Sequence, residues 1–149
     1  MKRKTLLAVA AIMALQSTLT MPRAALAQEA NACPVDGCLV QITSVSAEGD
    51  ELALTFEANF APDMSKNHIH VWWGDRFTVR QVSNNAETEY DQKQGDWHPT
   101  DAYPEYVTTG AASVSQRAET TMLCVSAADR NHDILDPEAF MCVDTAALF

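Results

Sequence analysis

The sequence contains none of the short motifs that mark the common enzyme classes. It has no GxSxG, no HExxH and no glycine-rich phosphate-binding pattern, and only five glycines occur among its 149 residues. A serine-hydrolase elbow, a zinc-protease helix and a dinucleotide-binding turn are therefore not indicated. Carboxylates are abundant, but pairs of them carry little information in a chain with twenty Asp and Glu residues. Catalysis is the less favoured class of function.

Basic residues are scarce, with ten Lys and Arg against twenty Asp and Glu. Four of the ten fall within the first 27 residues, namely Lys2, Arg3, Lys4 and Arg23. Without them the remaining chain has six basic residues against twenty acidic ones, a formal charge of −14. Such a surface repels phosphate, so we expect no nucleic-acid partner. The charge favours either simple solubility or the binding of cations.

Long apolar runs are also missing, because the longest, TLLAVAAIMAL, is shorter than the roughly 18 to 20 residues that span a bilayer. It follows the basic start MKRK and precedes Ala25-Leu26-Ala27, a pattern typical of a signal peptide cleaved before Gln28. We therefore expect residues 1–27 to be removed, with no transmembrane segment left afterwards. The absence of an N-x-S/T sequon after residue 27 favours a bacterial periplasmic or extracellular location.

All four cysteines lie after the expected cleavage site, and an even number in an exported chain predicts disulfides. Pro34 and Asp36-Gly37 are turn-forming residues that would bring Cys33 and Cys38 together. Cys124 would then pair with Cys142. We expect residues 28–38 to form a lead with a small disulfide loop, and residues 39–149 to form one domain.

That domain has no sustained helical period, and strand-like segments recur every ten to fifteen residues. The clearest alternates apolar and polar residues over 51–60. The pattern predicts an all-β antiparallel sandwich of about seven strands, which resembles the immunoglobulin or fibronectin type III architecture. The long polar connection 83–104 is expected either to carry function or to contain a short strand. The expected strands are Leu39–Val45, Glu51–Phe60, Asn67–Trp73, Arg76–Val82, Tyr106–Thr109, Glu119–Ala127 and Phe140–Thr145.

The segment NHIHVWW, residues 67–73, combines a core strand with concentrated side-chain chemistry. In an extended chain His68 and His70 point to one face, roughly 6.5 to 7 Å apart along the strand. Two such imidazoles can share a copper or zinc ion. We take His98 as the third ligand, with His132, Asp96 and Asp75 as alternatives. The competing interpretation is a pair of surface histidines, or histidines hydrogen-bonded beneath the long connection.

An acidic segment, DRNHDILDPE, spans residues 129–138. Its opening resembles the D-x-[DN]-x-[DN] start of calcium loops, in which oxygen atoms surround a hard cation. It differs from them because Ile134 replaces the glycine of the bend and Phe140 replaces the bidentate glutamate. An ordinary acidic turn is the simpler explanation. The candidate calcium ligands are Asp129, Asn131, Asp133 and Asp136.

The long connection brings aromatic residues next to carboxylates. Rings that stack on apolar faces beside carboxylates are typical of surfaces that bind glycans or peptides. Trp72, Trp97 and Tyr103 are therefore candidates for a ligand platform. The alternative is that these rings bury the connection onto the sheet.

The sequence leaves three hypotheses of function. The first is an exported, non-enzymatic binding or accessory module of the cell envelope or exterior, with a glycan, peptide or protein ligand. The second is a copper- or zinc-binding protein that uses the His-x-His pair. The third is a metal-dependent enzyme at the same site, which would need an open coordination position and a nearby base such as Asp96.

Overall fold

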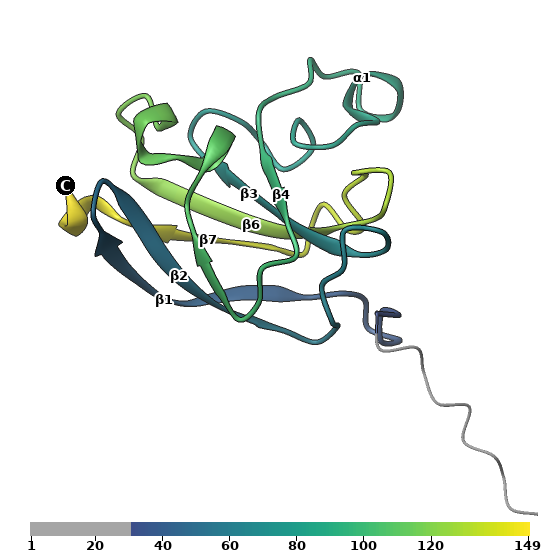
Figure 1. Cartoon of the computed structure of the whole chain (residues 1–149). Helices are drawn as coiled ribbons and strands as arrows, with labels where there is room; N and C mark the ends of the chain where they lie inside the picture. Colours follow the sequence, from purple (N-terminus) through teal and green to yellow (C-terminus); the bar gives the residue numbers. More distant parts are fainter. Residues whose placement is uncertain (1–30) are drawn as a thin grey trace, which may run out of the picture.

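A computed structural model describes residues 31–149, so the expected signal peptide and the first residues of the lead lie outside the described part. The protein is all-β, with two antiparallel sheets that face each other, as predicted (Figure 1). The first sheet has the order β1-β2-β5, built from β1 (Val40–Glu48), β2 (Glu51–Ala58) and β5 (Glu105–Val107). The second has the order β4-β3-β6-β7, built from β4 (His98–Thr100), β3 (His68–Trp73), β6 (Met122–Ala128) and β7 (Phe140–Asp144).

The helical elements of the described residues, 31–149, are all short. They are α1 (Ala86–Glu89) and the 3-10 turns η1 (Gly110–Ala112), η2 (Val114–Gln116) and η3 (Ala146–Leu148). Within residues 31–149 no helix has the length and apolar character needed to cross a membrane.

The main core lies between the two sheets and follows from the alternation in the sequence. Leu52, Leu54 and Phe56 of β2 point inward and are buried. From the opposite sheet, β3 contributes Ile69, Val71 and Trp73 to the same cluster. Burying side chains of this size contributes about 1.5–3 kcal/mol each.

A second apolar cluster covers the outer face of β3, so the histidines of this strand are not on the surface. Trp72 packs there with Val79, Val82 and Ile134, and all six residues of β3 are buried. The expected strand at residues 76–82 does not exist. This segment instead forms compact turns, in which the amide of Gln81 donates to the Thr78 carbonyl at 3.0 Å. The turns bury Val79 and Val82 against Trp72, which stabilises them through apolar burial.

Both predicted disulfides are present. Cys33–Cys38 closes a short loop before β1, and Cys124–Cys142 joins directly paired positions of β6 and β7. The long connection also contains the short strand that its length suggested, β4, which pairs with β3. Strand β3 therefore lies between β4 and β6 in its sheet.

One carboxylate fastens the segment after β5 to the start of β2. Glu51 accepts hydrogen bonds from the Thr108 hydroxyl at 2.6 Å, the Val114 amide at 2.9 Å and the Ser113 hydroxyl. Desolvation alone would raise the pKa of Glu51, but these three hydrogen bonds outweigh it and hold the pKa below its ordinary value. The ionised carboxylate is thus favoured in the folded protein.

We predict that Glu51→Ala lowers the free energy of unfolding by about 1–2 kcal/mol at neutral pH, because three donors lose their acceptor. Since the folded pKa is depressed, this contribution is present above the unfolded pKa of Glu and is lost as the pH falls through the folded pKa. The difference in unfolding free energy between wild type and Glu51→Ala, measured by urea unfolding, should be smaller at about pH 3 than at about pH 7. The exposed Glu48→Ala is the control, and an equal loss at both pH values would contradict the assignment.

Candidate metal centre

Strand β3 places two histidines side by side on its outer face. His68 and His70 are fully buried, and their Nε2 atoms lie 3.2 Å apart. Nδ1 of His70 is 2.8 Å from the carbonyl oxygen of Val82. Because a carbonyl only accepts hydrogen bonds, Nδ1 carries the proton and a neutral His70 presents its Nε2 lone pair to His68.

A third histidine arrives from the connection between β6 and β7. Nδ1 of His132 lies 2.9 Å from Nε2 of His68 and 3.4 Å from Nε2 of His70. We call His68, His70 and His132 the histidine triad. In residues 31–149 it is the group in which three potential metal ligands bring their ligand atoms within 4.8 Å of one another.

The acidic turn predicted as a calcium loop is what holds His132 in place. Oδ1 of Asp129 accepts hydrogen bonds from the amides of Asn131 at 2.8 Å and Asp133 at 3.0 Å. The amide of His132 donates to the Asp129 carbonyl at 2.9 Å, and the His132 carbonyl accepts from the Asn84 amide at 3.0 Å. His132 itself has φ of 66°, in the left-handed region that costs energy for a residue other than glycine.

Other oxygens of the predicted calcium ligands are also engaged within the protein. Oδ1 of Asp133 accepts from the Asn85 amide at 2.9 Å, and Oδ1 of Asp136 accepts from the Glu138 amide at 2.9 Å. The side-chain amide of Asn131 donates to Oδ2 of Asp129 at 3.4 Å. Calcium binding at this turn stays a prediction, while the observed bonds account for the same residues as supports of the turn.

The environment of the triad favours neutral imidazoles. The pKa of His70 is lowered to about 3, mainly by burial and also by the neighbouring His68 and His132, against the opposing effect of the Val82 carbonyl. Burial and the proximity of His132 also lower the pKa of His68. Nδ1 of His68 is buried without a well-formed hydrogen bond, although the backbone of Lys66 interacts with this ring and partly offsets the lowering. Neutral rings are the form that binds metal ions.

The spacing of the three facing nitrogens fits a transition metal. An ion about 2.0–2.1 Å from three nitrogens in tetrahedral geometry sets those nitrogens about 3.3 Å apart. The observed separations are 3.2, 2.9 and 3.4 Å. Imidazole ligands suit zinc and copper, whereas calcium and magnesium prefer oxygen. The bond from His70 to Val82 is the kind of outer contact that orients metal-binding histidines.

His98, the third ligand chosen from the sequence, is not brought to the pair. Its ring stacks on Tyr106 with the centroids 5.9 Å apart, and its Nδ1 lies close to Gly110. Of the alternative ligands, Asp75 accepts a hydrogen bond from the Thr120 hydroxyl at 2.8 Å, and Asp96 lies 4.0 Å from Arg76. His132, also an alternative, completes the triad.

The three residues of the expected ligand platform are not assembled on one surface. Trp72 is buried and donates from Nε1 to the Phe77 carbonyl at 3.0 Å. Tyr103 is exposed, and its hydroxyl accepts from the Ala58 amide at 3.4 Å. Trp97 stacks on His70 with the ring centroids 5.1 Å apart and the planes at 24°. Trp97 thus covers the ring of His70 on one side of the triad.

Comparisons of the chain with protein-family models, with curated proteins and with solved structures gave no match. Function is therefore inferred from the geometry of the site.

We predict that the metal-free protein loses stability as the pH falls below about 6.5, the ordinary pKa of histidine, and that His70→Gln reduces this loss. Because the folded pKa of His70 is about 3, the unfolded state binds more protons between these two values. Urea unfolding of chelator-treated protein at about pH 7 and about pH 5 measures the slope. An equal loss of unfolding free energy between the two pH values in wild type and in His70→Gln would contradict the assignment.

Proposed function

We propose that this protein binds a zinc or copper ion through His68, His70 and His132. The observation that carries the proposal is the convergence of three imidazole nitrogens at 2.9–3.4 Å, with the tautomer of His70 set by the Val82 carbonyl. Such a set of lone pairs, oriented by an outer hydrogen bond, is how proteins hold these metals.

The competing interpretation is a triad that is stabilised only by its own hydrogen bonds. A neutral His70 offers a lone pair at Nε2, and so does a neutral His68 if its proton is on Nδ1 beside the Lys66 backbone. The two lone pairs would then face each other at 3.2 Å with one N–H of His132 between them. A bound cation satisfies all three nitrogens at once, whereas unsatisfied buried polar atoms cost about 1–3 kcal/mol each.

We propose a role in metal sequestration or delivery rather than in catalysis. Both strand histidines are fully buried, and Trp97 stacks over His70, so the site suits a small ion better than a bulky substrate. The acidic chain is also suited to attract cations. The sequence predicted a general binding module, and we propose that its ligand is a metal ion.

We also propose export to a bacterial periplasm or exterior and an immunoglobulin- or fibronectin-type sandwich. Two disulfides support an oxidising compartment. The strand order β1-β2-β5 and β4-β3-β6-β7 supports the fold type, because it keeps the A-B-E and C-F-G neighbours of immunoglobulin domains. The fourth strand lies beside β3, the counterpart of C, instead of beside β5.

Thermal denaturation with zinc or copper, each compared with chelator, tests the metal site. We predict a rise in midpoint that grows with metal concentration and corresponds to about 2.7 kcal/mol at one hundred times the dissociation constant. His132→Ala should abolish the rise, because it removes one of the three nitrogens.

His98→Ala is the matched control, since it removes a histidine outside the triad. It should leave the metal-dependent rise intact. Unchanged midpoints for both metals in the wild-type protein would refute the proposal, and so would a shift that survives His132→Ala. Calcium belongs in the same series, with Asp133→Ala as the variant that tests the acidic turn.

A further inference from the structure

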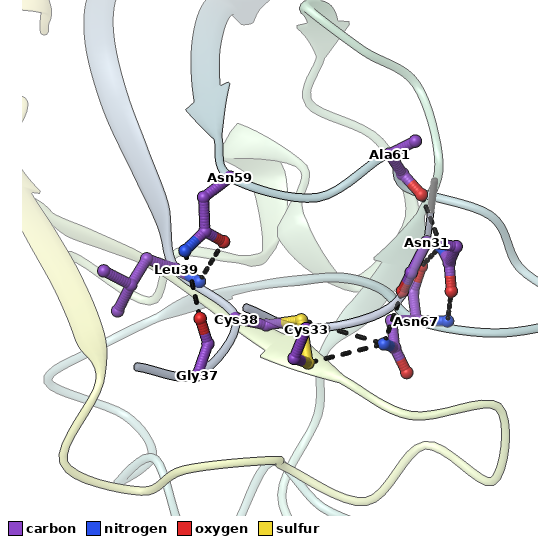
Figure 2. Close-up of a disulfide and its surroundings, with 8 residues drawn as sticks. All are labelled: Asn31, Cys33, Gly37, Cys38, Leu39, Asn59, Ala61 and Asn67. Atoms are coloured by element: carbon purple, nitrogen blue, oxygen red, sulfur yellow. Dashed lines mark hydrogen bonds between the residues drawn. A yellow bond between two sulfur atoms is a disulfide. The ribbon is translucent and has the colours of Figure 1, made fainter. Parts of the chain in front are cut away.

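The loop closed by the Cys33–Cys38 disulfide lies against Asn67, the residue just before β3 and its first histidine, His68. Figure 2 shows Asn67 between the disulfide and Asn31, with Asn59 on the other side of the loop. Asn67 is adjacent in sequence to His68, so any movement of its backbone moves the first metal ligand.

Asn67 and Asn31 are joined by reciprocal hydrogen bonds. The backbone amide of Asn67 donates to Oδ1 of Asn31 at 2.8 Å, and its Nδ2 donates to the Asn31 carbonyl at 2.8 Å. In return, Nδ2 of Asn31 donates to the Asn67 carbonyl at 2.9 Å and also to the carbonyl of Ala61. Asn31 is only 5% exposed. This pairing fixes the backbone on both sides of the Asn67 peptide.

The disulfide connects this pairing to the core. Nδ2 of Asn67 lies 3.5 Å from Sγ of Cys33 and 3.7 Å from Sγ of Cys38. Cys38 is buried in the main core, two residues before β1 begins. The covalent bond therefore ties Cys33, and with it the nearby Asn31, to the first sheet. Removing the bond frees the segment that holds Asn67, because the chain before Cys33 is then tethered through a more flexible loop.

The loop is placed where a thiol can reach it. Val35 at its tip is fully exposed and Cys33 is partly exposed. In both disulfides one cysteine is buried and its partner is partly exposed, Cys38 with Cys33 and Cys124 with Cys142. The two bonds differ in setting, because Cys33–Cys38 closes a loop with an exposed tip, whereas Cys124–Cys142 joins paired positions of two strands. Exposed disulfides are the ones that exchange most readily with thiols.

We propose that the Cys33–Cys38 disulfide is a thiol-sensitive latch that holds His68 in its metal-binding position, so that reduction weakens metal binding by the triad. This inference rests on the proposed function. In the reaction a dithiol attacks the disulfide, is itself oxidised to a disulfide, and passes two electrons and two protons to Cys33 and Cys38, which become free thiols. The latch then responds to thiol reductants in the compartment of the protein.

The test compares zinc affinity, by competition with a chromophoric chelator, in the oxidised wild type and in Cys33→Ser/Cys38→Ser. Serine is used because free thiols could bind zinc themselves. We expect the double variant to bind zinc at least about tenfold more weakly, the range typical when an outer contact of a metal ligand is lost. Asn67→Ala breaks the same connection while keeping the disulfide, and it should weaken binding in the same direction.

Asn59→Ala is the matched control. Asn59 holds the loop from the other side, by accepting from the Leu39 amide at 2.7 Å and donating to the Gly37 carbonyl at 3.0 Å, and it does not contact β3 in these bonds. Its loss should leave zinc affinity within about twofold of wild type, well below the tenfold effect of an outer ligand contact.

The outcomes separate the latch from the metal site itself. Absence of zinc and copper binding in oxidised wild type refutes the proposed function. Wild-type binding that is unchanged in both the cysteine double variant and Asn67→Ala refutes the latch alone. Circular dichroism of each variant checks that it folds, and if the double variant does not, Asn67→Ala against Asn59→Ala decides the question.

Discussion

The burial of both faces of β3 is the constraint on which the rest of the structure depends. Its inner face, with Ile69, Val71 and Trp73, is part of the core between the sheets. Its outer face would expose Trp72 and two histidines if the chain did not return across it. The segment after β3 and the β6–β7 connection supply that cover, and in doing so they bring polar imidazoles into a dry environment, where they need partners.

Burying the histidine triad therefore costs folding free energy, and the triad is also the most specific chemical feature of the protein. Three ring nitrogens in mutual contact, two of them on fully buried side chains, are costly without a shared proton or cation. The supports around them are equally specific, because the Val82 carbonyl orients His70 and the acidic turn forces His132 into a left-handed conformation. Strain of this kind is retained where the surroundings fix it, and it is common at functional sites.

Much of the fold could be predicted from the sequence, because it depends on local alternation and on turn residues. The β2 pattern and the turn residues between Cys33 and Cys38 are local signals, and the pairing of Cys124 with Cys142 follows once the first pair is assigned. The segment 76–82 misled the prediction, because Phe77 and Val79 alternate with polar residues as they would in a strand. In the fold, Val79 and Val82, three positions apart, both pack in the cluster with Trp72. The site was predicted in part: His68 and His70 follow from strand geometry, but the choice of His98 over His132 had no local signal to guide it.

The sequence by itself determined the all-β class and the common face of His68 and His70, because both follow from a period of two residues, and its turn residues favoured the pairing of Cys33 with Cys38. Only the tertiary structure decided that this face is buried and that His132 joins it. The reason is the antiparallel pairing of β3 with β6, which sets His68 opposite Ala128 and brings the following turn back over the strand. A contact between residues 64 positions apart depends on that register, and local sequence does not encode it.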